Sequence, residues 1–259
     1  MRLQIEANLD YFFPQPADVL LALEAAQMPD QRLVEDKLVV GTATPLTPVP
    51  GHQGIGRRIW TRGDGRFTAT YRATVDVTRE TPDLASLKAV PLTRLPGRTV
   101  HYLWPSRYCL PERLKDFAVE NFARLEGGAR VKAMAEWTRA NLAYTQGCSN
   151  EQTTANDTFE QKQGICRDFA HVLIAFSRAL DIPARMVSAY AFKLDPPDFH
   201  AVVEVYLDGG WYLVDPTGLA PVDGIVRIAV GRDAVDISFM TIFGAAELNA
   251  QKVWVTRLT

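Results

Sequence analysis

The residues best suited to covalent chemistry are a cysteine, a histidine and an aspartate in the second half of the chain. They are Cys166 in Gly-Ile-Cys-Arg-Asp-Phe-Ala-His, His200 in Asp-Phe-His-Ala, and Asp215 in Val-Asp-Pro-Thr. A thiol nucleophile, an imidazole base and an orienting carboxylate are the groups that attack on an acyl carbon requires. Their order indicates a thiol hydrolase or acyltransferase.

The residues around Cys166 predict that it lies in the first turn of an amphipathic helix. Gly164 precedes the helix, Pro183 ends it, and the apolar positions between them recur every three or four residues: Phe169, Val172, Leu173, Phe176 and Leu180. The free N–H groups and the macrodipole at a helix start stabilise a thiolate, and Arg167 adds positive charge. Position alone leaves open that Cys166 is a small buried hydrophobic residue, as most free cysteines are.

A predicted hairpin brings His200 and Asp215 together. Alternating stretches on both sides of Asp208-Gly209 predict two antiparallel strands joined at this turn signal. A two-residue turn there makes His200 and Asp215 diagonal neighbours, about 7–8 Å apart at the backbone. A turn at Gly209-Gly210 would instead place Glu204 opposite Asp215 and move His200 away. The first register predicts that the carboxylate orients the imidazole, which takes the thiol proton.

The other histidines are weaker candidates for the base. His171 lies on the predicted cysteine helix, about 140° around its axis from Cys166, so its side chain should point away from the thiol. We expect it to be a packing residue behind the site. His52 lies in a loop rich in Pro and Gly, and His101 lies near Pro105; both are expected to be structural or exposed.

These motifs resemble those of the bacterial transglutaminase-like superfamily, which belongs to the papain-fold cysteine proteases and acyltransferases. The resemblance covers roughly residues 105–259 and rests on the segments 164–171, 198–201 and 214–217, together with 105–109, 149–154 and 231–233. It implies that Cys166 is the nucleophile, His200 the general base and acid, and Asp215 the orienting carboxylate.

The resemblance also implies an α+β fold with a papain-like, or transglutaminase-like, core. In that core the cysteine helix packs on an antiparallel sheet that carries the other two groups. A β-rich domain often precedes the core in bacterial members. We therefore expect a β-rich N-terminal domain at residues 1–100 and a catalytic domain at residues 101–259.

The rest of the chain agrees with two such regions. Residues 66–78 alternate between apolar and polar side chains, which is typical of an antiparallel strand, and residues 42–56 predict a long surface loop. Prolines recur between residues 81 and 105 and predict an extended connection. Helices are then expected at residues 112–126, 129–142 and 154–163.

Composition excludes several classes of function. The 259-residue chain has a formal charge of −2 and a pI near 6.1, which gives no indication of nucleic-acid or membrane binding. It has no run of 18 apolar residues and no basic region followed by an apolar stretch at its start. The 3 cysteines, an odd number, favour a reducing compartment over a disulfide framework. We expect a cytoplasmic location.

Acyl transfer also needs hydrogen-bond donors for the developing oxyanion. The backbone N–H of Cys166 is the expected first donor because it lies at a helix start. The candidates for the second donor are four upstream side chains: Trp137, Ser149, Gln152 and Gln163. Trp137 is more typical of a packed residue on an apolar helix face.

A metal site is a weaker interpretation of the same residues. Cys166, His200 and Asp215 are not accompanied by a close ligand pair such as C-x-x-C or H-x-x-x-H, and no calcium loop is evident. No metal and no cofactor is expected. Cys109 and Cys148 are expected to be structural thiols. Asp168 could pair with Arg167 or Arg185, or simply favour the helix dipole.

The expected reaction is attack on an amide carbonyl to give a thioester acyl-enzyme. Water as the second substrate gives a protease, peptidase or amidase, whereas a primary amine gives a protein-glutamine transglutaminase. We expect hydrolysis of a peptide or protein amide, because water is always present. An inactive cleft that binds peptides and an assembly role for the N-terminal half are the alternatives.

Overall fold

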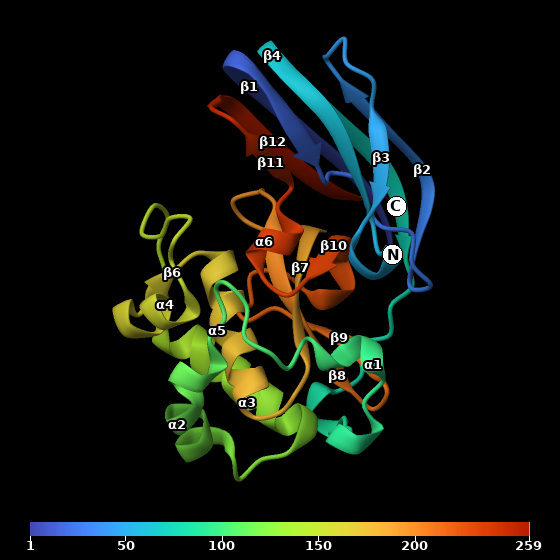
Figure 1. Cartoon of the computed structure of the whole chain (residues 1–259). Helices are drawn as coiled ribbons and strands as arrows, with labels where there is room; N and C mark the ends of the chain where they lie inside the picture. Colours follow the sequence, from blue (N-terminus) through green and yellow to red (C-terminus); the bar gives the residue numbers. More distant parts are fainter. Residues whose placement is uncertain (259) are drawn as a thin grey trace.

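The computed structural model describes residues 1–258 and contains two antiparallel sheets (Figure 1). Within these residues the long helices cover the smaller sheet, and none of them packs on the larger one. The larger sheet has the strand order β11-β1-β4-β2, with β12 paired to β1 and β3 to β4. Its strands are β1 (Arg2–Leu21), β2 (Gln31–Val40), β3 (Thr47–Pro50), β4 (Arg57–Val77), β11 (Met240–Phe243) and β12 (Glu247–Leu258). This sheet forms the upper layer of the molecule in Figure 1.

Strict alternation fixes the inner face of the larger sheet. Leu3, Ile5 and Ala7 on β1 are fully buried and pair with Val75, Ala73 and Tyr71 on β4. The residues between them on β1 lie on the opposite, exposed or partly exposed face. The strand predicted at residues 66–78 is part of β4. The loop predicted at residues 42–56 is interrupted by β3 and by a 3-10 helix, His52–Gly54.

The smaller sheet forms the core of the lower layer and has the order β10-β7-β8-β9. Its strands are β7 (Ala184–Ala191), β8 (His200–Leu207), β9 (Gly210–Val214) and β10 (Ile225–Gly231). The longer helices of this layer are α2 (Pro111–Phe122), α3 (Gly127–Asn141), α4 (Ala155–Gln161) and α5 (Cys166–Ala179). Short elements complete it: α1 (Gly97–Val100), α6 (Ala234–Ile237), β5 (Ala143–Tyr144) and β6 (Gln163–Gly164), and the 3-10 helices Leu84–Ser86, Leu92–Arg94 and Val222–Gly224.

Helix α5 is the central element of the lower layer. Its residues from Asp168 to Ala179 are all buried, because α2, α3 and α4 contact it together with β7 and β8. Aromatic rings of the neighbouring helices pack around Phe176, with ring centroids between 5.4 and 6.0 Å from it: Phe117, Phe122, Trp137 and Phe159. The predicted α+β core, with the cysteine helix packed on an antiparallel sheet, is confirmed.

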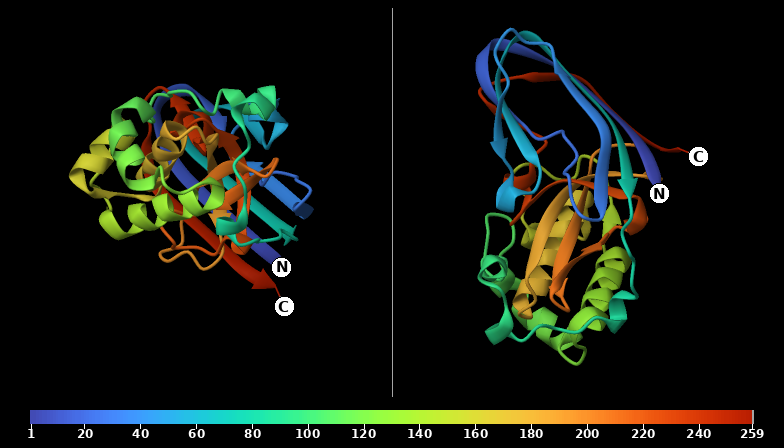
Figure 2. Two further views of the ribbon diagram at one scale, coloured as in Figure 1. Left: turned by 90° about the horizontal axis from the view of Figure 1, so that it is seen from below. Right: turned by 90° about the vertical axis from the view of Figure 1, so that its right-hand side faces the viewer.

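The C-terminal end of the chain does not follow the predicted division at residue 100. β12 pairs with the first part of β1, from Arg2↔Leu258 to Phe12↔Glu247. β11 pairs with the last part of β1, from Asp18↔Phe243 to Leu21↔Met240. Residues 240–258 therefore belong to the same sheet as residues 2–77. The chain ends lie side by side in both views of Figure 2.

The two layers share a buried contact. Tyr190 on β7 stacks on Tyr71 of β4 with a centroid distance of 6.0 Å, and its hydroxyl donates a 2.7 Å hydrogen bond to the carbonyl of Leu23. Gln31 on β2 accepts from the backbone N–H of Arg227 on β10. None of the helices within residues 1–258 is both long and apolar enough to cross a membrane.

Candidate active site

Cys166 is the first residue of α5, as its motif predicts. The helix start is held by Asp168, whose carboxylate accepts a 2.9 Å hydrogen bond from the backbone N–H of Ile165 and another from Arg167. A side chain at Gly164 would place its Cβ 2.7 Å from Cβ of Asp168, so this turn requires glycine. The Cys166 side chain is partly exposed and forms no disulfide. The thiol thus lies where a helix N-terminus stabilises negative charge.

The hairpin that carries His200 and Asp215 has the two-residue turn that the sequence predicts. Leu207 pairs with Gly210, and both turn residues have positive φ, 46° at Asp208 and 81° at Gly209. This register places Nε2 of His200 3.0 Å from Oδ2 of Asp215. The alternative turn at Gly209-Gly210 is thereby excluded.

Asp215 is held as an anion in a nearly closed environment. Besides His200, its carboxylate accepts hydrogen bonds from the backbone and hydroxyl of Thr217 at 2.9 and 2.7 Å, and from the backbone N–H of Ala220 at 3.0 Å. Burial alone would raise the pKa of Asp215, but these donors together lower it below its usual value. A carboxylate fixed in this way orients the imidazole.

The imidazole of His200 is buried, and only one of its nitrogens has a hydrogen-bond partner in the described part of the chain. Nε2 bonds Asp215, whereas Nδ1 has none. Burial opposes the charged form of His200, but the hydrogen bond to Asp215, its negative charge and the neighbouring Cys166 outweigh it and raise the pKa to about 9. At neutral pH the ring is therefore an imidazolium next to the thiol.

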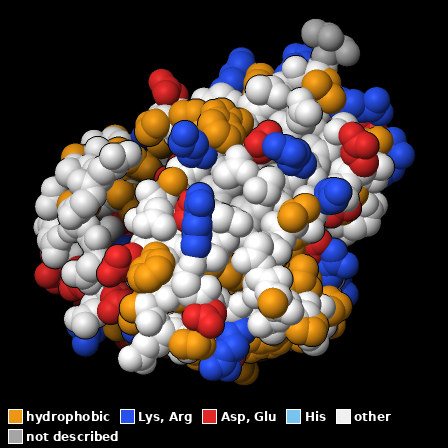
Figure 3. Space-filling model, turned by 90° about the horizontal axis from the view of Figure 1, so that it is seen from above, with side chains coloured by type: hydrophobic (Ala, Val, Ile, Leu, Met, Phe, Trp, Pro, Cys, Tyr) orange, Lys and Arg blue, Asp and Glu red, His pale blue; other side chains and the backbone are white. Residues whose placement is uncertain are grey.

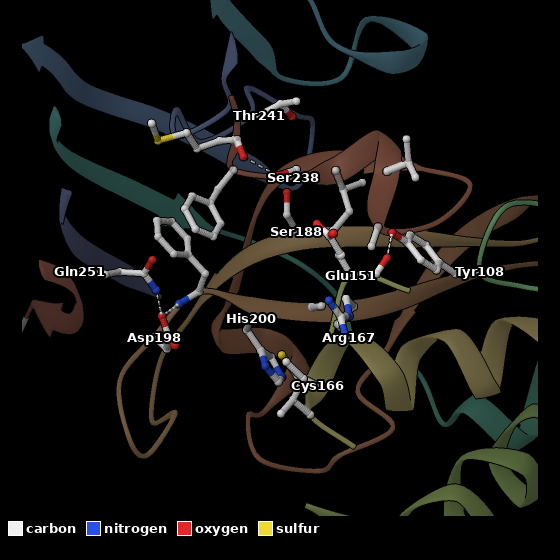
Figure 4. A pocket seen from close by; sticks show the side chains of 18 of the residues that line it. Tyr108, Glu151, Cys166, Arg167, Ser188, Asp198, His200, Ser238, Thr241 and Gln251 are labelled. Carbon is white, nitrogen blue, oxygen red and sulfur yellow. Dashed lines mark hydrogen bonds between the residues drawn. The ribbon is translucent and has the colours of Figure 1, made fainter. Parts of the chain in front are cut away.

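Cys166 and His200 open into a cavity of ≈ 790 Å³ between the two layers (Figure 4). One wall belongs to the lower layer and includes Ser188, Phe199 and Tyr108. The other consists of α6, β11 and the segment between them, with Gln251 of β12 hydrogen-bonded to Asp198 across one end at 2.6 Å. The cavity is thus completed by the C-terminal segment.

The lining combines aromatic and charged side chains. Phe199, next to His200, stacks on Phe239 with a centroid distance of 4.4 Å and an interplanar angle of 8°. Arg107, Arg167 and Glu151 also line the cavity. Seen from above, the outer surface mixes hydrophobic side chains with charged ones of both signs (Figure 3).

His171 lies away from the thiol, as its helical position predicts. It is fully buried, its ring stacks on Tyr108 with a centroid distance of 5.0 Å, and its Nε2 accepts a 3.3 Å hydrogen bond from the backbone N–H of Ala234. Burial lowers the pKa of His171 to about 3, so the ring is neutral. Its position connects α5 to the pocket walls formed by Tyr108 and α6.

The other two histidines contact each other. Nε2 of His52 lies 3.2 Å from Nε2 of His101, at the seam between the larger sheet and α1. Both have lowered pKa values, because burial disfavours the charged ring. Neither lines the cavity of Cys166.

The remaining thiols and the acid at the helix start have local partners. Cys109 is fully buried, which raises its pKa to about 12, and its Sγ contacts the carbonyl of His171 at 3.6 Å. Cys148 donates to the carbonyl of Thr145 at 2.9 Å. Asp168 pairs with Arg167, at 3.0 Å, and not with Arg185.

The four side chains predicted as second oxyanion donors do not line the cavity. Trp137 packs between Phe117 and Phe159, and Ser149 accepts a hydrogen bond from Arg167. Gln152 and Gln163 are also outside it. The structure places Tyr144 and Gln146 there instead, and neither was predicted. No local pattern distinguishes them, because their position depends on β5 pairing with β6.

Comparison with known proteins agrees with this geometry. The sequence model of the transglutaminase-like superfamily matches residues 119–216, a range that contains all three residues of the site. The crystal structure of a candidate cysteine protease from Cytophaga hutchinsonii superposes with a TM-score of 0.94 at 35% identity, over 100% of this chain and 91% of that one. The chain belongs to the transglutaminase-like superfamily.

A curated relative is similar over a shorter range. An uncharacterized protein of Mycobacterium leprae is 32% identical over 117 residues, which span 42% of this chain and 42% of that protein. The agreement with the Cytophaga structure, in contrast, extends over both sheets. The likeness to the Cytophaga structure thus includes the arrangement of the larger sheet on the cysteine-containing core.

Proposed function

We propose that this member of the transglutaminase-like superfamily is a cysteine-dependent amide hydrolase that cleaves peptide or protein amides through a thioester acyl-enzyme. The observation that carries the proposal is the environment of His200. One ring nitrogen is fixed by Asp215, while the other has no hydrogen-bond partner within residues 1–258 and belongs to a ring that interacts with Cys166. His171 also leaves its Nδ1 without a partner among the described residues, but its Nε2 is bonded to a backbone N–H and its ring lies away from the thiol. The combination of a carboxylate partner and a neighbouring thiol is what distinguishes His200.

The first half of the reaction follows from these contacts. His200 holds the proton that the thiol gives up, so Cys166 attacks the amide carbonyl as a thiolate and a C–S bond forms. The carbonyl π electrons move to oxygen, next to the backbone N–H of Cys166. When the tetrahedral intermediate collapses, the C–N bond breaks and Nδ1 of His200 donates its proton to the leaving amine.

The second half uses the same groups in reverse. Neutral His200 takes a proton from water, the hydroxide adds to the thioester carbonyl, and the C–S bond breaks to release the carboxylic acid. Asp215 keeps its negative charge throughout and stabilises each imidazolium that forms. A primary amine in place of water would give transamidation by the same steps.

The shape of the cavity supports a peptide substrate. A volume of ≈ 790 Å³ is in the range of pockets that enclose drug-sized ligands, so it fits several residues of an extended chain. The Phe199–Phe239 stack next to His200 provides an apolar wall, so we expect substrates with an apolar side chain near the cleaved bond.

The test is the rate of alkylation by labelled iodoacetamide as a function of pH, with the labelled cysteine mapped by mass spectrometry. We expect labelling specific for Cys166 at pH values well below the ~8.5 of a free thiol, and slower labelling in His200→Ala. A peptide screen with and without a primary amine then separates hydrolysis from transamidation. Slow labelling, or labelling mainly at Cys148, would contradict the proposal and favour a peptide-binding cleft.

A further inference from the structure

A short parallel strand pair lies directly before the nucleophile. Tyr144 of β5 pairs with Gly164 of β6, two residues ahead of Cys166. The pair is fixed on both sides, because the N–H of Ala143 donates to the carbonyl of Lys162 at 2.8 Å and the N–H of Thr145 donates to the carbonyl of Gly164 at 3.0 Å. The backbone of Tyr144 therefore cannot move independently of the start of α5.

The side chain of Tyr144 packs on the first turn of α5 and lines the cavity of Cys166. Its ring packs against Phe169, one turn along α5 from Cys166, with a centroid distance of 5.9 Å. It lines the same cavity as Cys166 and His200. Burial raises the pKa of the Tyr144 hydroxyl, and the charge on Cys166 raises it further. The hydroxyl therefore keeps its proton throughout the neutral range.

The position of this hydroxyl has a specific chemical meaning. When Cys166 attacks a carbonyl, the oxygen becomes negative close to both the sulfur and the backbone N–H of the same residue. Tyr144 lines the cavity next to Cys166, and its ring packs on the first turn of the same helix. A protonated phenol there can turn its O–H toward the oxyanion, and it costs little reorganisation because its backbone is already fixed.

We propose that Tyr144 is a catalytic residue whose hydroxyl donates the second hydrogen bond of the oxyanion hole. The inference rests on the proposed acyl transfer and adds a residue to it. Gln146, two residues further along and on the same cavity wall, is the rival donor. The backbone N–H of Ile165 is excluded, because it is already bonded to Asp168.

Two reactions of Cys166 separate this role from others. Alkylation by iodoacetamide is a displacement at a saturated carbon and forms no oxyanion, whereas acylation by p-nitrophenyl acetate does. Tyr144→Phe should leave the alkylation rate within about 3-fold of wild type and lower the acylation rate by about 100-fold, the usual effect of removing one oxyanion donor. Binding of a peptide aldehyde, whose thiohemiacetal carries a similar oxygen, should weaken in parallel.

A matched control is Tyr206→Phe. Tyr206 lies six residues along β8 from His200, roughly 20 Å away, and packs against Trp211 at 5.2 Å. This variant should keep both rates. Gln146→Ala should keep the acylation rate within a few-fold.

Several results would overturn the inference. If Gln146→Ala loses acylation and Tyr144→Phe does not, the donor is Gln146. If Tyr144→Phe slows alkylation and acylation equally, the hydroxyl acts on the thiol, and if it accelerates acylation, the hydroxyl blocks the site. A wild-type protein that is neither alkylated at Cys166 nor acylated would contradict the proposed function itself, and this would be visible before any variant is made.

Discussion

Strand β8 carries two buried charged clusters that differ in how completely their polar atoms are used. At its first residue, His200 bonds Asp215 through Nε2 only, and its Nδ1 has no partner among the described residues. Four residues on, both carboxylate oxygens of Glu204 are bonded, Oε2 by Arg185 at 2.7 Å and Oε1 by Arg227 at 2.6 Å. Arg227 also bonds Asp30, in the turn directly before β2 of the larger sheet, at 2.8 Å.

From this difference we propose that the His200 cluster is reactive and the Glu204 cluster structural. Glu204 has a pKa below its usual value, because the two arginines outweigh the effect of its burial. Both oxygens of the Glu204 carboxylate are used by arginines of its own sheet, and Arg227 links that sheet to Asp30 next to β2. The His200 cluster leaves one nitrogen available, next to a thiol and a cavity. An unused polar atom in a buried position is costly, and at His200 it lies where a proton could pass between the thiol and a bound substrate.

The largest expected effect comes from removing the reactive group. Cys166→Ala should lower peptide cleavage by about 10⁶-fold, as loss of a nucleophile does in other triad enzymes, and should leave the free energy of unfolding within about 1 kcal/mol, since the side chain is partly exposed. The cleavage rate is measured with the best peptide from a screen, and the free energy of unfolding is measured in urea. Cys148→Ala is the matched thiol control and should retain turnover; equal loss in both variants would mean that Cys166 is not the nucleophile.

The structural cluster should show the opposite pattern. Glu204→Gln leaves two buried guanidinium groups without their shared anion, so we expect a loss of about 3–5 kcal/mol in the free energy of unfolding. The rate at which iodoacetamide alkylates Cys166 in the protein that remains folded should change by less than about 3-fold. Urea unfolding at pH 7 tests this, with Glu120→Gln on the exposed side of α2 as the control. A loss below 1 kcal/mol would show that the network does not hold the layers together.

A conservative change at Asp215 sharpens the comparison. Asp215→Asn preserves an acceptor for His200 but removes the charge, so kcat/KM for a peptide anilide should fall about 100-fold. In wild type the pKa of His200 is raised to about 9, so the proton for the leaving amine is present below that pH and is lost as pH rises through it. The alkaline limb of the pH–rate profile should therefore move to lower pH in the variant. The exposed Asp223→Asn should leave the limb in place.

The smallest effect is expected at His171, the buried histidine behind the site. Its pKa is lowered to about 3 in the folded protein, against ~6.5 in an unfolded chain. Between these values the unfolded state binds more protons, so the free energy of unfolding should rise with pH by up to about 1.4 kcal/mol per unit. In His171→Gln this contribution should disappear. Urea unfolding at pH 4, 5 and 6 measures it; an identical slope in both proteins would contradict a buried neutral imidazole.

Local pattern was sufficient for the elements nearest the chemistry. The apolar spacing after Gly164 predicts α5, and Asp208-Gly209 predicts the hairpin, because a two-residue turn with two positive φ values is specific to such sequences. Once the turn is fixed, the alternation of side chains along the hairpin makes Asp215 the diagonal neighbour of His200. The 3.0 Å contact with Asp215 follows from these local rules.

Short-range sequence patterns did not predict strand pairings between segments that are distant in the chain. On β12 only Val253 is buried, so its alternation is too weak to indicate a sheet, and its partner β1 lies at the other end of the sequence. The strand pair that fixes Tyr144 involves only two residues on each side, too few for any periodicity. For this reason the four side chains that the sequence offered as second oxyanion donors do not line the cavity, and Tyr144 was not among them.

The sequence by itself determined the identity and order of the reactive groups, the cysteine helix and the hairpin register, because each depends on residues close together in the chain. Only the tertiary structure decided what surrounds them. The cavity wall from α6 and β11, the saturated Glu204 network and the placement of Tyr144 arise from pairings between distant segments. Such pairings are selected by total burial and hydrogen bonding of the whole chain, which no local window contains.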